Sequence, residues 1–147
     1  MLEIEKDRKT KTAVICPVIK TAAGMMTAEE EAARENEAAG LVLAMGQEVV
    51  FCETVRMSAI VPKSFFGKGT LERLKTACEE KGAELLVVDM PVSAVQQRNL
   101  EKMLNMKVID RTAVILEIFG QRAQTREGKL QVELAHLTYQ RGRLVRS

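Results

Sequence analysis

The side chains most suited to chemistry in this sequence are the basic ones near its C-terminus. Residues 119–147 carry six basic and two acidic side chains, a net charge of +4, whereas residues 1–118 carry a net charge of −2. The six are Arg122, Arg126, Lys129, Arg141, Arg143 and Arg146. The first three recur at intervals of three and four residues, which predicts that they share one face of a helix. Several cations on one face favour contacts with nucleic-acid phosphates, although a solvated helix surface gives the same pattern.

A second candidate site is the turn Gly67-Lys68-Gly69, which precedes a predicted helix. Glycine amides at the start of a helix can hold an anion, but the complete phosphate-binding loop pattern is absent from the sequence. Asp89 ends an apolar segment, at the position where open parallel sheets bind ligands. Gly67, Lys68, Gly69 and Asp89 are therefore candidate contacts for a phosphate or nucleotide. A glycine-permitted turn and a loop cap are the alternative interpretations.

Catalytic and metal-binding sets are not evident in the sequence. His136 is the single histidine, and we expect a partly exposed helix residue there, without a nucleophile or acid poised beside it. Cys16, Cys52 and Cys78 lie far apart in the sequence with no CxxC spacing, which indicates reduced and mostly buried thiols. The sequence thus predicts neither catalytic residues nor a metal site.

Short apolar strands alternate with helices along residues 12–110. The predicted strands cover residues 12–19, 47–55, 84–89 and 107–110, and the predicted helices cover residues 28–45, 69–81 and 91–104. This alternation is typical of βαβ units, so we expect an α/β fold with a small, four-stranded, mostly parallel sheet flanked by helices. Pro17 within the first strand predicts an edge position or an irregular strand end.

The first predicted helix begins with a capping box, because Thr27 precedes Glu30 by three positions. We expect its inner face to consist of Ala32, Asn36, Ala39 and Leu43.

Asp110 can cap a further helix, which Gly120 can bend. A long amphipathic segment then follows Thr125. Four leucines recur in this segment at helical spacing: Leu130, Leu134, Leu137 and Leu144. A lone helix of this kind cannot bury its apolar face by itself, so the sequence predicts half of a helical hairpin. We expect an α/β subdomain over residues 1–110 and a helical segment over residues 111–147.

The composition excludes several classes of protein. Hydrophobic residues make up 46% and charged residues 29% of the chain, which is ordinary for a globular protein and argues against disorder. Aromatic residues make up only 3%, which argues against a surface that stacks bases. No apolar run approaches the roughly 18–20 residues of a membrane helix. The charged N-terminus lacks the apolar centre of a signal peptide, so we expect a cytoplasmic protein without a membrane span.

Three blocks between Val92 and Leu137 resemble the N-terminal region of HflX-type GTPases, which are ribosome-associated proteins. They are QRNLE (97–101) leading into KVIDRT (107–112), ILEIF (115–119) leading into QRA (121–123), and Thr125 with EGKLQVELA (127–135). The turn formed by residues 66–69 also resembles a family element, with its lysine and glycine placed differently. The resemblance is specific over about residues 64–146 and weak before them.

This resemblance implies a small parallel α/β subdomain followed by a helical hairpin, both in contact with ribosomal RNA of the large subunit. It also implies that GTP and Mg²⁺ belong to a GTPase domain, whose motifs are absent from this sequence. We therefore expect a non-catalytic module that binds the ribosome or rRNA and has no cofactor of its own. The expected RNA contacts are Arg122, Arg126, Lys129, Arg141 and Arg143.

Two other functions remain open at this stage. The leucine face of the last helix would suit a protein-interaction or dimerisation domain, including self-association. Alternatively, the α/β part would bind a nucleotide near Lys68 and Asp89.

Overall fold

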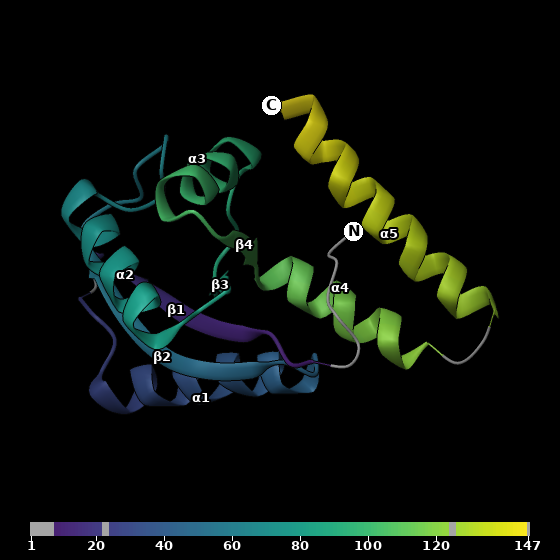
Figure 1. Cartoon of the computed structure of the whole chain (residues 1–147), viewed down its shortest axis with the longest axis horizontal. Helices are drawn as coiled ribbons and strands as arrows, with labels where there is room; N and C mark the ends of the chain where they lie inside the picture. Colours follow the sequence, from purple (N-terminus) through teal and green to yellow (C-terminus); the bar gives the residue numbers. More distant parts are fainter. Residues whose placement is uncertain (1–7, 22–23, 124–125, 147) are drawn as a thin grey trace.

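The computed structural model describes residues 8–21, 24–123 and 126–146, and the side chains among them except at 126–127 and 143–146 (Figure 1). The elements assigned are β1 (Lys11–Ile19), α1 (Ala28–Ala44), β2 (Glu48–Met57), α2 (Lys68–Lys81), β3 (Leu85–Val88), α3 (Ala94–Leu104), β4 (Lys107–Asp110), α4 (Arg111–Arg122) and α5 (Arg126–Arg146). The strands form one parallel sheet in the order β2-β1-β3-β4. This confirms the predicted α/β fold with a long last helix, while the division at residue 110 stays a prediction.

Helices cover both faces of the sheet (Figure 1). One core cluster packs α2 and α3 against one face, with Leu74 of α2 and Leu100 of α3 fully buried in it. The other cluster packs α1 and α4 against the opposite face, with Val42 of α1 and Val114 of α4 at its centre. Burial on both faces explains why β1 and β3 are continuous apolar runs rather than alternating ones.

Of the two positions predicted for Pro17, an edge strand or an irregular strand end, the first is wrong because β1 lies between β2 and β3, and the second fits the structure. The pairing of β1 with β3 covers only Thr12 to Ile15, so Pro17 lies beyond the end of β3. The Ile15 carbonyl accepts from the backbone N–H of Asp89 at 2.9 Å, which sets the side of β1 that faces β3. Pro17, two residues further along, faces the same side. Because β3 has already ended there, no strand needs the N–H that proline lacks.

The inner face predicted for α1 is also wrong. The capping box at Thr27 is confirmed, but the buried residues of the helix are Glu31, Ala38 and Val42, and Leu43 is 60% exposed. The helix carries alanines on several faces, so its apolar pattern fits more than one rotation. The observed rotation places Ala38 and Val42 in the core, and it lets the Glu31 carboxylate accept from Arg56 Nε on β2 at 3.0 Å.

Side chains of α3 close the outer edge of β4. Gln97 Nε2 donates to the Val108 carbonyl at 2.7 Å, and Glu101 Oε2 accepts from the Val108 N–H at 3.1 Å. Asn99 Nδ2, on the same helix, donates to the Lys63 carbonyl at 2.8 Å and holds the loop before α2. The QRNLE block therefore satisfies backbone groups that an uncovered sheet edge would leave open.

The last helix runs back along α4 toward α3 (Figure 1). Gly120 of α4 faces Val132 and His136 of α5, and a Cβ built on it would lie 3.5 Å from Val132 Cγ1 and 4.0 Å from His136 Nε2, which is ordinary van der Waals contact. Three leucines on the opposite side of α5 stay exposed: Leu130, Leu134 and Leu137. Within the described residues, no helix is both long and apolar enough to cross a membrane.

The three cysteines are free thiols, as expected, with Cys16 and Cys78 buried. Strand pairing brings Cys16 close to Cys52 although the two are distant in sequence. A hydrogen bond to Cys52, together with burial, raises the pKa of Cys16. Burial raises the pKa of Cys78 to about 11. Both groups are therefore protonated and unreactive at neutral pH.

The rotation of α1 can be tested with two adjacent substitutions. Val42→Ala removes two buried methyl groups, so we expect it to lower the free energy of unfolding by about 2 kcal/mol. Leu43→Ala is the matched control, and its effect should stay within about 0.5 kcal/mol because that side chain faces solvent. Urea unfolding followed by circular dichroism measures both values. A larger loss for Leu43→Ala than for Val42→Ala would contradict the observed rotation.

Candidate functional site

The crevice between the carboxyl ends of β1 and β3 is the position where open α/β sheets usually bind ligands. The chain leaves β1 toward one side of the sheet and reaches β3 on the other, which opens this crevice. In this structure the crevice holds the guanidinium of Arg34, from α1. Arg34 Nε donates to Asp89 Oδ2 at 3.2 Å, Arg34 Nη2 donates to the Asp89 carbonyl at 2.8 Å, and Arg34 Nη1 donates to the Pro17 carbonyl. A side chain of the protein therefore occupies the usual ligand position.

Asp89 is the centre of a charged network that joins two helices to the sheet. Its side chain is 3% exposed. Arg111, the first residue of α4, donates from Nη1 to Asp89 Oδ1 at 3.0 Å and from Nη2 to Glu37 Oε1 at 2.7 Å. Hydrogen bonds to Glu37, and then to Asp89, raise the pKa of Arg111. The two arginines balance the two carboxylates, so Asp89 has a structural role that its position in the sequence does not reveal.

The glycine-lysine turn lies apart from this network. Gly67 is the N-cap of α2, in an extended conformation and without a side-chain cap. Lys68 is exposed and lines a pocket of about 420 Å³ between α2 and α3, together with Ser64, Leu71, Glu72, Lys75 and Met103. Asp89 is not part of that lining. The four residues expected to contact one phosphate or nucleotide thus lie in two places, and an anion contact at Lys68 stays a prediction.

The basic residues of the C-terminal segment fall into two groups. Arg122 ends α4 and Lys129 lies in the second turn of α5, and both side chains are exposed. Arg141 is also exposed, but it lies twelve residues beyond Lys129, which is about 18 Å along a helix axis. The side chains of Arg126 and Arg143 lie outside the described residues. The prediction that Arg122, Arg126 and Lys129 share one face of a helix is wrong, because Arg122 belongs to α4 whereas Arg126 and Lys129 belong to α5.

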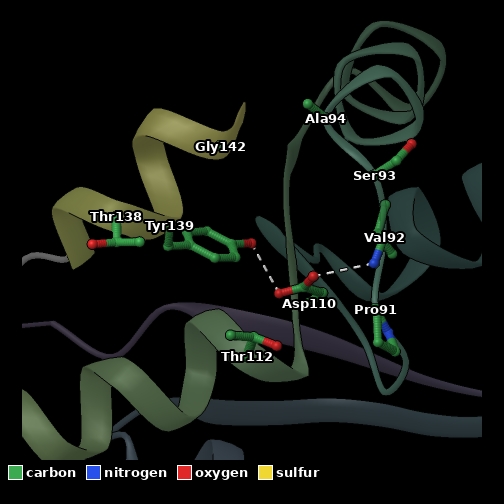
Figure 2. Close-up of a pocket in the computed structure, with 9 residues that line it drawn as sticks. All are labelled: Pro91, Val92, Ser93, Ala94, Asp110, Thr112, Thr138, Tyr139 and Gly142. Atoms are coloured by element: carbon green, nitrogen blue, oxygen red, sulfur yellow. Dashed lines mark hydrogen bonds between the residues drawn. The ribbon is translucent and has the colours of Figure 1, made fainter. Parts of the chain in front are cut away.

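A second buried carboxylate, Asp110, connects three elements (Figure 2). Its Oδ1 accepts from the Ala113 N–H at 3.2 Å, which confirms the predicted cap of α4, and from the Tyr139 hydroxyl at 2.9 Å. Its Oδ2 accepts from the Val92 N–H at 3.1 Å. A pocket of about 290 Å³ lies beside these groups, between the start of α3 and α5. The attachment through Tyr139 was not predicted, because no local pattern in the sequence relates that residue to Asp110.

His136 is buried rather than partly exposed, so its predicted environment is wrong. It faces Gly120 of α4, and within the described residues His136 Nε2 and Glu117 Oε1 are buried polar atoms without a hydrogen-bond partner. The described residues contain no group of three or more histidine, cysteine or acidic side chains that could hold a metal ion.

The network around Asp89 should stabilise the fold measurably. We expect Asp89→Ala to lower the free energy of unfolding by about 3 kcal/mol, because it leaves the partly buried guanidinium of Arg34 without its carboxylate. The matched control is Glu53→Ala, which breaks an exposed pair with Arg73 and should cost about 1 kcal/mol or less. Urea unfolding gives both values. Equal losses in the two variants would show that the network adds no more than a surface ion pair.

Comparisons with known protein families give two adjoining matches. Residues 32–120 match the family described as GTP-binding GTPase N-terminal, and residues 122–147 match the family described as GTP-binding GTPase Middle Region. The first match covers more than half of the chain and begins well before residue 64, where the resemblance in the sequence becomes specific.

Several curated relatives are named GTPase HflX. The protein from Magnetococcus marinus is 48% identical over 112 residues, which are 76% of this chain and 26% of that relative. The Escherichia coli protein is 44% identical over 111 residues, with the same shares of 76% and 26%. The protein from Flavobacterium psychrophilum is 35% identical over 141 residues, which are 95% of this chain and 33% of that relative. The chain thus spans about a quarter to a third of the length of these relatives.

Solved structures support the fold. A GTP-binding protein from Sulfolobus solfataricus in complex with GDP gives a TM-score of 0.61 at 23% identity, covering 88% of this chain and 37% of that one. A structure described as an SsGBP and GDP complex gives a TM-score of 0.69 at 22% identity, covering 94% and 37%. By its family match and its relatives, the chain belongs to the GTP-binding GTPase N-terminal family, the N-terminal domains of HflX-type GTPases.

Proposed function

We propose that this chain is a non-catalytic module that binds the large ribosomal subunit through its rRNA, as part of an HflX-type GTPase. The observation that carries this proposal is the set of exposed cations on the C-terminal helices, at Arg122, Lys129 and Arg141. The ribosome is assembled and used in the cytoplasm, so we propose that compartment for the module.

Several arginines of the body are already paired with carboxylates. Arg8 pairs with Glu84, Arg56 with Glu31 and Arg73 with Glu53. In the described part of the chain, no carboxylate lies within ion-pair distance of Arg122, Lys129 or Arg141. Cations without a carboxylate partner are available to phosphates, and each phosphate contact adds affinity through counterion release.

The absence of catalysis is part of the same proposal. The two buried carboxylates at the ends of β3 and β4 are occupied by Arg34, Arg111 and Tyr139, and by backbone N–H groups. They are not positioned as general acids or bases for a substrate. We therefore assign binding of GTP and Mg²⁺, and GTP hydrolysis, to the regions of HflX-type GTPases that this chain does not match.

Co-sedimentation with 50S subunits and 70S ribosomes over a salt series tests the proposal. We expect binding that weakens as salt rises, because phosphate contacts release counterions. The double variant Arg122→Gln with Lys129→Gln should reduce the slope of log K against log salt by about two.

The control for this experiment is Arg73→Gln, which removes a cation that already has a carboxylate partner on the body. It should leave both the affinity and the salt slope unchanged. Absence of binding at low salt, or equal effects of Arg73→Gln and the double variant, would contradict the proposal.

A second candidate function is protein interaction through α5. Leu130, Leu134 and Leu137 are 55%, 65% and 63% exposed and lie on the side of the helix opposite Val132 and His136. An apolar stripe of this length on a surface helix is a common feature of protein interfaces. The partner considered in this proposal is a second copy of the chain. The side chain of Leu144 lies outside the described residues.

Sedimentation equilibrium of the purified chain at several concentrations tests self-association. If α5 pairs with itself, the chain sediments as a dimer and Leu134→Gln makes it monomeric. Leu43→Gln is the matched control, because Leu43 is an equally exposed leucine on α1, and it should leave the dimer intact. A monomer at all concentrations would exclude this function.

A further inference from the structure

The pocket between α2 and α3 combines apolar walls with unpaired cations. Lys68, Leu71 and Lys75 follow one another along one face of α2, and Met103 lies opposite on α3. Leu71 is buried at the floor, whereas Met103 is a large apolar side chain that remains 42% exposed. A volume of about 420 Å³ falls within the range of about 300–1,000 Å³ typical of small-ligand sites.

Two exposed lysines line this pocket, Lys68 and Lys75. In the described residues, neither Lys68 nor Lys75 has a carboxylate within ion-pair distance. Two further exposed cations without such a partner, Arg98 and Lys102, lie on α3 outside the pocket lining. The one acidic side chain in the lining is Glu72. The surface therefore complements an anionic ligand that also has an apolar part.

We propose that this pocket holds one unstacked nucleotide of a single-stranded RNA segment. The base packs against the aliphatic side chains of Leu71 and Met103 rather than stacking on an aromatic ring, because the described lining contains none. The flanking phosphates contact Lys68 and Lys75, which are about 10 Å apart along the axis of α2. Single-stranded RNA is recognised by such splayed-out bases, since their edges and faces are accessible. This inference rests on the proposed function for its choice of an RNA partner, but it uses a surface distinct from the C-terminal cations.

Glu72 gives the pocket a base preference. A carboxylate accepts a hydrogen bond from the exocyclic amino group of cytosine, whereas uracil presents a carbonyl oxygen at the same position. We therefore expect the pocket to prefer cytosine over uracil.

Binding of RNA octamers to the whole chain, measured by fluorescence anisotropy, tests the proposal. Octacytidine should bind roughly three to ten times more tightly than octauridine, and Glu72→Gln should reduce that ratio. The double variant Lys68→Gln with Lys75→Gln should weaken binding about tenfold and lower the salt slope by about 1.4, the value for two phosphates of a single strand. Met103→Ser should weaken binding without changing the slope, because it removes an apolar contact only.

Lys81→Gln is the matched control, since Lys81 is an exposed lysine on the same helix outside the pocket. It should leave affinity and slope unchanged. Photochemical cross-linking of an octamer carrying 4-thiouridine should label residues 64–75 or Met103. All five substituted residues have side chains at the surface, and unchanged melting temperatures would show that the variants fold.

The outcomes separate this inference from the proposed function. If octamers bind and their affinity falls only in the double variant Arg122→Gln with Lys129→Gln, and not in the pocket variants, the pocket is not the site and the proposed function stands. If no RNA or ribosome binding occurs, both are overturned. If cytidine monophosphate binds as tightly as the octamer, the pocket is a mononucleotide site and the RNA assignment is wrong.

Discussion

The burial of one carboxylate, Asp89, constrains much of this structure. A charge removed from water needs opposite charge and hydrogen bonds around it, and Arg34 and Arg111 supply both. Because these arginines come from α1 and α4, the requirement ties both helices to the end of β3. The same guanidinium groups fill the crevice where sheets of this kind bind ligands. The binding surfaces that we propose accordingly lie on the helices rather than at this end of the sheet.

Asp110 repeats this arrangement one strand away. Its carboxylate caps α4, holds the loop before α3 and accepts from Tyr139 of α5. The carboxyl ends of two adjacent strands are thus used to orient four helices. What remains for binding partners is the outer surface of those helices, where the cations without carboxylate partners and the exposed leucines are found.

Local signals in the sequence were sufficient for the elements and the fold class. Capping residues and apolar runs, including the short run that forms β4, depend only on residues near them in the chain. They were insufficient for Leu43, since an alanine-rich helix fits several rotations and the face that packs on the sheet is decided by contacts with distant segments. The two positions predicted for Pro17 could not be told apart, because strand order is a property of the whole sheet. The role of Asp89 required Arg34 and Arg111, which lie 55 and 22 residues away. The cations of the C-terminal segment were visible in the sequence, but the partners that neutralise other arginines were not.

The central place of β1 has a consequence for synthesis of the chain. The strand made first acquires β2 as its neighbour early, but its other edge stays open until β3 has left the ribosome. Arg34 likewise has no Asp89 to pair with during that interval. A nascent chain of this topology exposes an apolar strand edge for as long as α2 is being made, which is the kind of surface that recruits chaperones. The sheet therefore cannot be complete until more than half of the residues of this chain have been made.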